Sequence, residues 1–302
     1  MEGPDEQSIT PRWLREHLPR RDEMAHKGDF GRVLVLGGSL EYPGAAVLAG
    51  LGAMRGGAGL VRVAVAASVH ARMAGTAPEL TWMILDEEVP GLIAPGGWRR
   101  LSAEAGDFDA IVIGPGIGLQ TATQRRTRSF LATVPRPAVV DADGLNALAA
   151  EADWWRKVRA QELILTPHPG EFARLTGSSA PDAADDAGRR MAAVDAAARW
   201  GQVVVLKGAR SVVAAPDGRV LLSPVATAAL ATAGSGDVLS GLIGAFLAAG
   251  ASPLEAAGCG VGLHAASGLV AEERMGSAGA LAGDLARLIP EARRRLSAVP
   301  PR

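Results

Sequence analysis

The arrangement of apolar residues constrains this chain more than any other feature. From Arg32 onward, short runs rich in Val, Ile and Leu alternate with longer stretches rich in Ala and Leu. The runs are 33–36, 60–65, 110–113, 138–140, 163–165 and 203–206, and the stretches of helical length are 45–55, 123–133, 145–150 and 184–200. Continuous apolar runs are typical of strands buried on both faces, as in a parallel sheet with helical crossovers. The pattern predicts an α/β fold with six buried strands.

The pattern changes after Leu206. Two short β-rich segments, 211–215 and 219–222, flank the turn Pro216-Asp217-Gly218 and predict an antiparallel hairpin, so we expect a mixed sheet. From Val238 to the end, three helical stretches follow, with breaks at 250–253 and near 276–279.

Neither an internal repeat nor a low-complexity linker divides the chain. We expect residues 1–25, which are polar and rich in arginine and acids, to form a loosely packed N-terminal arm. Residues 26–298 are then a single catalytic domain. The apolar run 238–251 has about 14 residues where a membrane span needs roughly 20, so it predicts a buried helix. No membrane association is expected.

Charge and cysteine usage limit the possible binding partners and the cellular compartment of this chain. There are 31 basic and 32 acidic residues, so the chain lacks the basic excess that is typical of nucleic-acid-binding proteins. A nucleic-acid partner is therefore not expected. The single cysteine, Cys259, lies in an apolar stretch and suits a small core residue in a reducing compartment. The N-terminus has no apolar signal core and no transit-peptide character, so we expect a cytoplasmic protein.

The loops after the predicted strands are the places to look for chemistry, because open α/β sheets bind ligands beyond the carboxyl ends of their strands. Two of these loops are rich in glycine, Gly37-Gly38-Ser39 and Gly114-Pro115-Gly116-Ile117-Gly118. Neither fits G-x-G-x-x-G, and no lysine precedes Ser or Thr. The sequence therefore lacks the motifs that are the main evidence for a dinucleotide-binding Rossmann domain or a P-loop NTPase.

Three further loops carry candidate polar groups. Asp141, Asp143 and Asn146 surround a helix start, where they cap the helix, hold a substrate hydroxyl or contact Mg²⁺ through water. His168 lies between two prolines that stiffen its loop, which favours a substrate contact over a purely structural hydrogen bond. The segment Lys207-Gly208-Ala209-Arg210-Ser211 follows an apolar strand and is either exposed surface or a lining of the nucleotide site.

The strongest signal is the turn Gly234-Ser235-Gly236-Asp237, which opens directly into a long apolar helix. Free N–H groups and the helix dipole at such a turn form an anion hole for phosphate oxygens. Asp237 falls in the first helical turn, where the dipole favours its ionised form. Capping alone explains an aspartate there, but a carboxylate beside a bound phosphate favours a catalytic base for phosphoryl transfer.

These motifs carry a resemblance to a known family. The late Gly-Ser-Gly-Asp turn resembles that of the ribokinase-like kinases, and the remaining motifs look like those of the ADP/ATP-dependent NAD(P)H-hydrate dehydratases. They are His26-Lys-Gly-Asp-Phe-Gly31, Gly37-Gly-Ser39, Pro43-Gly-Ala-Ala46, Gly114-Pro-Gly-Ile-Gly118, Asp141-Ala-Asp143 and Thr166-Pro-His-Pro-Gly-Glu171. The similarity runs from about His26 to Pro290. It implies a ribokinase-like three-layer α/β/α sandwich with a mainly parallel, partly mixed central sheet.

The resemblance also implies roles for particular residues. Ala45, Gly118 and His168 would contact the hydrated nicotinamide cofactor, Lys207 to Ser211 and Gly236 the adenine nucleotide, and Asp237 would be the base. The family often has Asn-Pro-Gly-Met where this chain has Thr227-Ala228-Ala229-Leu230, so an asparagine contact is not carried over.

The implied reaction is the dehydration of (6S)-NAD(P)H hydrate back to NAD(P)H. The C6 hydroxyl is phosphorylated by ADP or ATP and then lost as phosphate, and ADP is the favoured donor. Mg²⁺ is expected, because phosphate charge must be offset near Asp237. A homotetramer is expected from the family. A fused epimerase of about 200 residues, which bifunctional members carry, is not expected.

Two other functions remain open at this point. One is an ordinary ribokinase-like kinase that phosphorylates a vitamin-precursor alcohol, such as a thiazole or pyrimidine, and releases a stable ester. The other is a non-catalytic adenine-nucleotide sensor that uses the same helix terminus without chemistry.

Overall fold

The computed structural model describes residues 6–158 and 161–298. Within these residues, ten strands form the main sheet, and two more form a small separate hairpin. The main-sheet strands are β1 (Glu6–Ser8), β2 (Arg32–Leu36), β3 (Leu60–Ala66), β4 (Thr81–Leu85), β7 (Ala110–Ile113), β8 (Ala138–Val140), β9 (Leu163–Leu165), β10 (Val203–Leu206), β11 (Val212–Ala214) and β12 (Val220–Leu222). The hairpin consists of β5 (Glu87–Val89) and β6 (Leu92–Ile93).

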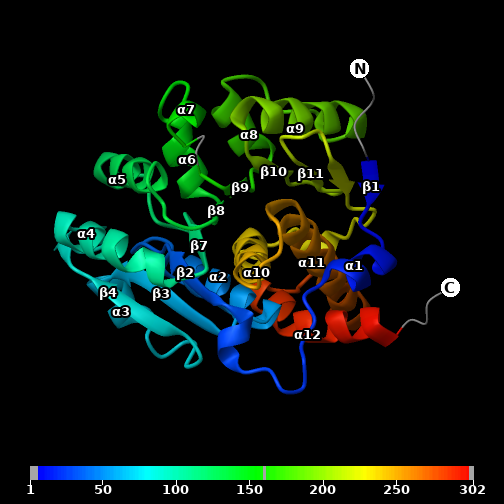
Figure 1. Cartoon of the computed structure of the whole chain (residues 1–302), viewed down its shortest axis with the longest axis horizontal. Coiled ribbons are helices and arrows are strands. Elements are labelled where there is room, and N and C mark those ends of the chain that lie inside the picture. Colours follow the sequence, from blue (N-terminus) through cyan, green and yellow to red (C-terminus); the bar gives the residue numbers. More distant parts are fainter. Residues whose placement is uncertain (1–5, 159–160, 299–302) are drawn as a thin grey trace.

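Helices cover both faces of the sheet (Figure 1). On one face lie α2 (Pro43–Gly56), α3 (Ala67–Met73), α10 (Ser235–Ala248) and α11 (Pro253–Met275), with α12 (Ala282–Ala298) and α1 (Pro11–His17) packed outside them. On the other face lie α4 (Pro95–Glu104), α5 (Thr121–Leu131), α6 (Asp143–Ala149), α7 (Trp155–Val158), α8 (Pro169–Thr176) and α9 (Asp186–Trp200). Three 3₁₀ turns, η1 (Lys27–Phe30), η2 (Ala105–Asp107) and η3 (Ala228–Leu230), complete the described elements.

The strand order is β1-β12-β11-β10-β9-β8-β7-β2-β3-β4. Strands β10 through β4 in this order are all parallel, whereas β11 is antiparallel to both of its neighbours. The expected three-layer sandwich with a mainly parallel, partly mixed sheet is therefore confirmed. The carboxyl ends of β7, β8, β9 and β10 lie side by side, so the loops that follow them meet at one edge.

The six apolar runs predicted as strands are β2, β3, β7, β8, β9 and β10, and the predicted hairpin is β11 and β12. The three predicted C-terminal helices are α10, α11 and α12. The edge strands β1 and β4 were not predicted. β1 is the exposed tripeptide Glu-Gln-Ser and has no apolar residue, whereas β4 contains the apolar run Trp82-Met-Ile-Leu85, which the sequence analysis did not single out.

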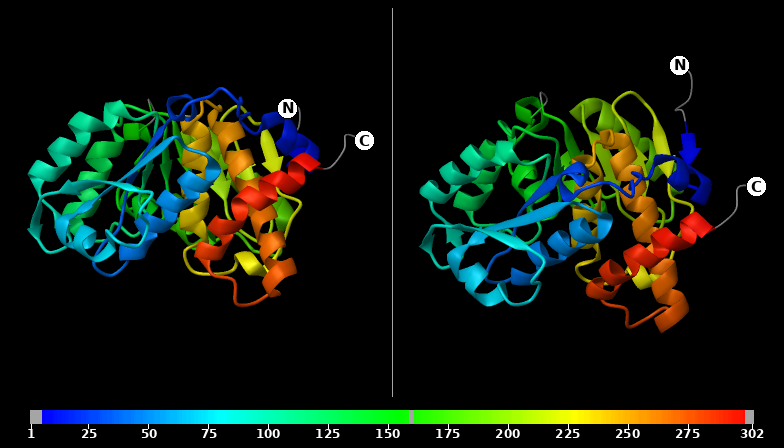
Figure 2. Two further views of the ribbon diagram at one scale, coloured as in Figure 1. Left: turned by 90° about the horizontal axis from the view of Figure 1, so that it is seen from below. Right: turned by 60° about the horizontal axis from the view of Figure 1, so that its bottom comes forward.

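The N-terminal segment packs more tightly than expected of a loose arm. β1 pairs in parallel with β12, and the side chains of Ile9, Trp13 and Leu14 are buried. A Cβ atom added at Gly258 would lie 2.7 Å from the Trp13 ring, which shows how closely α1 approaches α11. Figure 2 shows α1 beside the C-terminal half of α12. Where the catalytic domain begins, at residue 26 or earlier, stays a prediction.

Two apolar helices, α10 and α11, form the buried layer between the sheet and the outer helices α1 and α12. In α10, every residue from Val238 to Ala248 is buried, as expected for the short apolar run. Cys259 in α11 is buried as well. Within the described residues, α11 is the one helix long and apolar enough to cross a membrane by composition, and 83% of its apolar window is buried inside the fold. Burial of this kind is also found for core helices.

Glycine allows α2 and α10 to approach closely. A Cβ atom added at Gly241 of α10 would lie 1.8 Å from the backbone oxygen of Ala49 in α2, and one added at Gly52 of α2 would lie 2.3 Å from Val238 O. Backbone atoms cannot swing away as a flexible side chain can. The contact therefore requires glycine at both positions.

Gly241→Ala should destabilise the protein by about 2 kcal/mol or more, because overpacking two helices against each other outweighs the helix propensity gained with alanine. Gly283→Ala in α12 is the matched control, since nothing lies within 4 Å of an added Cβ there. Urea unfolding of both variants measures the difference. Equal stability of the two variants would contradict the tight α2–α10 contact.

Candidate active site

The turn before α10 has an irregular backbone that only glycine adopts easily. Gly234 has φ of +85° and precedes the first helical residue, Ser235. A Cβ atom at Gly234 would also lie 2.5 Å from the Leu48 side chain. Both the conformation and the close packing therefore require glycine at this position.

The open donors of the turn are fewer than the sequence suggested. Ser235 N donates to Thr232 O at 3.2 Å, so this N–H is already used. In the part of the chain that the structure describes, the N–H groups of Gly236 and Asp237 have no backbone acceptor. These two groups stand at the positive end of the α10 dipole, where an anion is stabilised. Of the proposed anion hole, Gly234 and Gly236 thus keep an N–H without a backbone acceptor among the described residues, whereas the N–H of Ser235 is already used.

The Ser235 side chain points inward to a histidine that the sequence analysis did not single out. Ser235 Oγ lies 3.2 Å from His264 Nε2, and both residues are buried. Burial lowers the pKa of His264 to about 4, so the ring is neutral at pH 7. The contact ties the first turn of α10 to α11. A histidine inside an otherwise apolar helix was the only signal in the sequence.

Asp237 lies in the first turn of α10, and its protonation differs from the expectation. Burial, followed by repulsion from Asp141, raises its pKa from 3.8 to about 7, although Lys207 acts in the opposite direction. The helix dipole alone favours the ionised form, but desolvation has the larger effect here. Asp237 is therefore poised to exchange a proton near neutral pH, as a general base must be.

Lys207 forms the centre of a buried ion-pair network. Its Nζ lies 2.8 Å from Asp141 Oδ1 and 3.7 Å from Glu171 Oε2, and the two carboxylates are 1% and 6% exposed. Burial alone would lower the pKa of Lys207, but the two carboxylates raise it overall, so the ammonium stays charged. Burial raises the pKa of Glu171. Lys207 is thus a partnered ammonium and not exposed surface.

This network reaches the turn before α10. A Cβ atom added at Gly236 would lie 3.3 Å from Lys207 Nζ and 3.8 Å from Asp141 Oδ2. Because β8 ends at Val140 and β10 at Leu206, their carboxyl ends bring Asp141 and Lys207 together against Gly236. The structure therefore joins three segments that are far apart in sequence into one charged site.

Asp143 and Asn146 support a neighbouring loop. Asp143 Oδ2 accepts from Gly118 N at 2.9 Å, and Asp143 Oδ1 accepts from Asn146 Nδ2 at 3.3 Å. Asn146 Oδ1 in turn accepts from Arg174 Nε at 2.8 Å. The residue between the two aspartates, Ala142, has the unusual φ of +48°. Strained backbone of this kind is concentrated at functional sites.

Ala45 lies against the same glycine-rich loop. A Cβ atom added at Gly116, whose φ is +61°, would lie 2.9 Å from the Ala45 Cβ. The first turn of α2 and the loop after β7 are therefore adjacent, which brings Ala45 and Gly118 to one region. The lack of a side chain at 116 is what permits this approach.

His168 has a structural role that accounts for one of its ring nitrogens. Its Nδ1 accepts from Gly170 N at 3.0 Å and from Glu171 N at 3.3 Å, which caps α8. Nδ1 is then the acceptor, so the ring proton is on Nε2. The side chain is 50% exposed, and Nε2 lies 3.4 Å from Glu171 Oε1. Substrate contact by His168 stays a prediction.

The segment from Lys207 to Ser211 divides between two places. Lys207 belongs to the charged site, whereas Arg210 and Ser211 line a cavity of about 290 Å³ beside α9 and β12. Arg210 Nη1 lies 3.4 Å from Asp186 Oδ2 in that cavity. At Gly208, an added Cβ would lie 2.2 Å from Arg189 Nη2. A side chain at this position would therefore collide with the Arg189 guanidinium in its present position. Contact of Ala209 with the nucleotide stays a prediction.

Together, the mixed three-layer sheet and a helix N-terminus that carries Asp237 beside Lys207 define a ribokinase-like enzyme. Comparison with known proteins narrows the class. The family model described as NAD(P)H-hydrate dehydratase matches residues 33–291, so the chain belongs to the NAD(P)H-hydrate dehydratase family.

Named relatives agree with this family. The chain is 37% identical to the ADP-dependent (S)-NAD(P)H-hydrate dehydratase of Xanthomonas campestris, over 96% of this chain and 97% of that protein. It is 41% identical to the bifunctional NAD(P)H-hydrate repair enzyme Nnr of Moorella thermoacetica, over 95% of this chain and 54% of that protein. This chain thus spans about half the length of such bifunctional relatives.

Solved structures show the same relationship. The ADP/ATP-dependent NAD(P)H-hydrate dehydratase of Bacillus subtilis, co-crystallised with ATP and Mg²⁺, superposes with a TM-score of 0.79 at 34% identity, over 98% of this chain and 99% of that chain. A hydroxyethylthiazole kinase of Pyrococcus horikoshii superposes with a TM-score of 0.57 at 16% identity, which shows a shared fold alone.

Proposed function

We propose that this protein catalyses the ADP-dependent, or ATP-dependent, dehydration of (6S)-NAD(P)H hydrate to NAD(P)H, and so repairs damaged nicotinamide nucleotides. One observation carries the proposal: Asp237, whose pKa is raised to about 7, lies in the first turn of α10 next to the open N–H of Gly236. A proton acceptor and an anion-binding group are thus adjacent, as phosphoryl transfer to a hydroxyl requires.

In the proposed reaction, Asp237 accepts the proton of the C6 hydroxyl as that oxygen attacks the terminal phosphorus of the nucleotide. The new bond is C6–O–P, and the bond that breaks joins this phosphorus to the bridging oxygen of the nucleotide. The ring nitrogen lone pair then expels phosphate from C6, and loss of a proton from C5 restores the dihydronicotinamide. Lys207 holds positive charge where phosphate charge accumulates.

The ligand contacts follow the same proposal. Ala45, Gly118 and His168 contact the hydrated nicotinamide nucleotide, because Ala45 and the loop of Gly118 are adjacent and His168 is half exposed. Gly236 and the segment from Lys207 to Ser211 contact the adenine nucleotide, with Arg210 and Ser211 in the cavity beside α9. A cavity of about 290 Å³ lies at the lower end of the volumes of small-molecule sites.

Mg²⁺ is proposed to enter with the nucleotide. Among the described residues, no group of three or more His, Cys, Asp or Glu side chains could hold a metal ion by itself. Mg²⁺ is often bound by one or two carboxylates together with substrate phosphates and water. Asp141 is the candidate carboxylate, because Lys207 contacts its Oδ1 while its Oδ2 faces Gly236. The ion would offset phosphate charge.

A homotetramer, expected from the family resemblance, and a cytoplasmic location, expected from the sequence, belong to the same proposal. Size-exclusion chromatography with light scattering of the purified full chain measures the oligomeric state. Fractionation of cells that express the tagged full chain measures the location.

The deciding experiment is to give the purified protein chemically prepared NADH hydrate, ADP and Mg²⁺. We expect the 340 nm absorbance of NADH to return with one phosphate released per NADH formed. Accumulation of a stable phosphate ester without NADH would instead favour a kinase. Nucleotide binding without any turnover would favour a sensor.

Turnover should depend on pH with an apparent pKa near 7. Asp237 acts in its deprotonated form, and its pKa in the folded protein is about 7, so kcat/KM should fall about tenfold per pH unit below that value. Steady-state rates between pH 5.5 and 9 measure the profile. A profile that is flat between pH 5.5 and 7 would remove Asp237 from the role of base.

The raised pKa of Asp237 also makes stability depend on pH. Turnover should rise with pH, whereas the contribution of Asp237 to stability should fall. Because the folded-state pKa of Asp237 lies above the ordinary 3.8, the folded protein binds the proton more tightly than the unfolded chain does. The contribution of this group to stability is therefore present at low pH and is lost as the pH rises from about 4 to about 7.

A further inference from the structure

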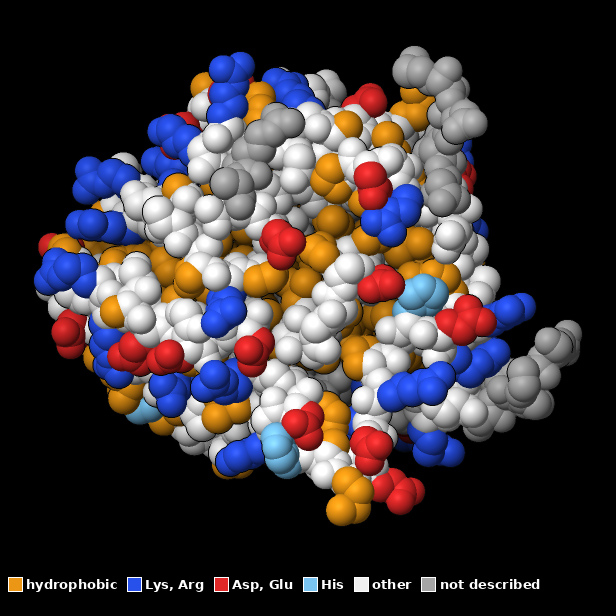
Figure 3. Space-filling view, in the orientation of Figure 1, with side chains coloured by type: hydrophobic (Ala, Val, Ile, Leu, Met, Phe, Trp, Pro, Cys, Tyr) orange, Lys and Arg blue, Asp and Glu red, His pale blue; other side chains and the backbone are white. Residues whose placement is uncertain are grey.

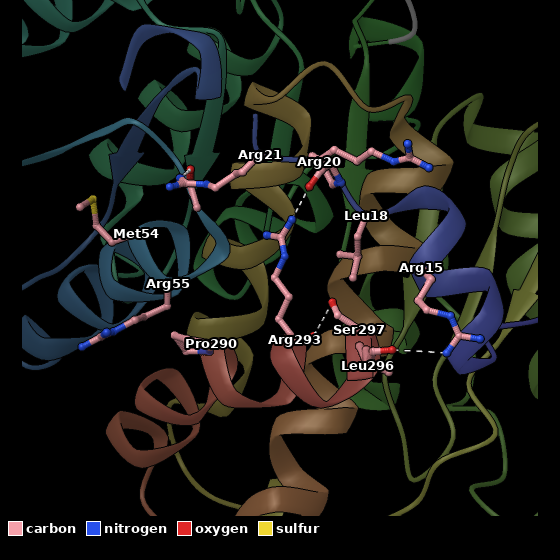
Figure 4. Close-up of a pocket in the computed structure, with 12 residues that line it drawn as sticks. Arg15, Leu18, Arg20, Arg21, Met54, Arg55, Pro290, Arg293, Leu296 and Ser297 are labelled. Atoms are coloured by element: carbon pink, nitrogen blue, oxygen red, sulfur yellow. Dashed lines mark hydrogen bonds between the residues drawn. The ribbon is translucent and has the colours of Figure 1, made fainter. Parts of the chain in front are cut away.

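A second cavity lies away from the candidate active site. Its volume is about 730 Å³, it opens to the surface, and it is lined by α1 and the segment after it, the C-terminal end of α2 and the C-terminal half of α12. Figure 4 shows the residues that line it. They are Arg15, Leu18, Pro19, Arg20, Arg21, Met54, Arg55, Gly57, Pro290, Arg293, Leu296 and Ser297. We call it the arginine cavity.

The charge of the arginine cavity is one-sided. Five of its twelve lining residues are arginines, and none is Asp or Glu. The chain has 28 arginines in 302 residues, so twelve residues drawn at random would include about one. In the face shown by Figure 3, by contrast, basic side chains are interspersed with acidic ones. The composition of the chain does not account for this cluster.

Neutral acceptors hold three of these arginines in place. The Arg15 guanidinium donates to Leu296 O at 3.3 Å, and that of Arg21 donates to Gly57 O and stacks 4.0 Å above the Phe30 ring. The Arg293 guanidinium donates to Gly56 O at 3.3 Å and to Pro19 O. Carbonyl oxygens at helix ends orient the guanidinium groups but leave their charge uncompensated.

Five like charges therefore line the arginine cavity. Burial and the neighbouring Arg21 lower the pKa of Arg293, and among the described residues the acceptors of this side chain are carbonyl oxygens. In Figure 4, Arg293 stands in the middle, with Arg21 and Arg55 on one side and Arg15 and Arg20 on the other, and the guanidinium groups of Arg20 and Arg55 point outward. An anion in this space would relieve the repulsion, and rotation of the exposed Arg20 and Arg55 side chains would bring their donors to it.

Two arginines of the cavity, Arg20 and Arg55, make no contact that would explain them as structural residues. Within the described chain, neither Arg20 nor Arg55 makes a hydrogen bond or an ion pair, and both are exposed. Capping of helix ends explains Arg15, Arg21 and Arg293 but leaves these two unexplained. Their guanidinium groups are free to bind a ligand.

We propose that the arginine cavity is a binding site for a small molecule that carries two or more phosphate groups. Guanidinium groups bind phosphate oxygens with paired, charge-assisted hydrogen bonds. The volume falls in the range of small-molecule sites. Among the described residues, no carboxylate lines the cavity to repel such a ligand.

The arginine cavity is distinct from the candidate active site. It lies at the C-terminal end of α2, whereas Ala45 lies in the first turn of the same helix, and the 14 residues of α2 span about 20 Å. The proposal thus stands whether or not the protein proves to be a dehydratase.

The test is a calorimetric titration of the full chain with inorganic tripolyphosphate at low ionic strength. Arg20→Ala/Arg55→Ala should weaken binding at this site by about tenfold or more, a change of about 1.4 kcal/mol or more, without lowering the melting temperature. The matched control is Arg99→Ala/Arg126→Ala, which removes two exposed arginines that make no hydrogen bond or ion pair with any described residue and should leave the affinity unchanged.

Several results would overturn the proposal. One is affinity that the Arg20→Ala/Arg55→Ala change leaves untouched, which would assign all binding to the turn at Gly236. Another is an equal loss in the control variant, which would reflect net charge alone. A third is sulfate binding as tightly as tripolyphosphate. A fourth is arginine-dependent binding of an acidic peptide but not of tripolyphosphate, which would indicate a protein partner.

Discussion

Asp237→Asn should lower the turnover of NAD(P)H hydrate by about 100-fold or more while the affinity for ADP or ATP stays within a few-fold. Asparagine keeps the size and hydrogen-bonding capacity of the side chain but cannot accept the hydroxyl proton. The Gly236 N–H and the Lys207 ammonium remain in place, so nucleotide binding should persist. Steady-state kinetics and a separate nucleotide titration measure the two effects.

The control for this variant is Asp195→Asn in α9. Asp195 is exposed and makes no hydrogen bond or ion pair within the described chain, so its neutralisation should leave turnover unchanged. If Asp237→Asn loses nucleotide affinity as strongly as turnover, Asp237 supports binding and is not the base. If neither parameter changes, the proposed mechanism is wrong at its first step.

Lys207→Met should lower the free energy of unfolding by about 3–5 kcal/mol at pH 7, because removal of one partner leaves buried charges uncompensated. Lys207 lies against Asp141 and Glu171, which are 1% and 6% exposed, and it also acts on Asp237. The loss should shrink at low pH, where Glu171 and Asp237, whose pKa values burial raises, take up protons. Urea unfolding at pH 5 and pH 7 measures both effects.

Lys157→Met is the matched control, since Lys157 also pairs with a carboxylate, Glu151, but is 64% exposed. Exposed pairs contribute about 1 kcal/mol or less, so this variant should be close to the wild type. Asp141→Asn in the Lys207→Met background should recover part of the lost stability, because it removes one of the unpaired charges. Equal effects of the two lysine substitutions would show that the Lys207 network is not buried as described.

The predicted strands and the observed ones differ mainly at the edges of the sheet. The six central strands are apolar on both faces, and such runs are visible in the sequence because helices cover both sides. β1 has no apolar residue and exists because β12 offers it backbone partners. Pairing of this kind depends on a neighbour that lies more than two hundred positions away, so local composition carries no sign of it.

For the candidate site, the sequence indicated which segments to examine. Asp141, Lys207 and Asp237 each follow an apolar run or open an apolar helix, and the doubly wound arrangement requires such positions to meet at one edge. His264 was missed, because nothing in an apolar helix distinguishes a histidine that packs from one that contacts a neighbouring helix. Its partner, Ser235, lies on α10.

The sequence by itself determined the layered fold, the family and the turn at Gly234 to Asp237, since periodicity and short motifs are local properties. Only the tertiary structure decided that Lys207 pairs with Asp141 and Glu171, that Ser235 turns toward His264, and that Asp237 titrates near pH 7. The physical reason is that desolvation and Coulomb interaction depend on burial and on distance through space. Neither can be read from positions along the chain.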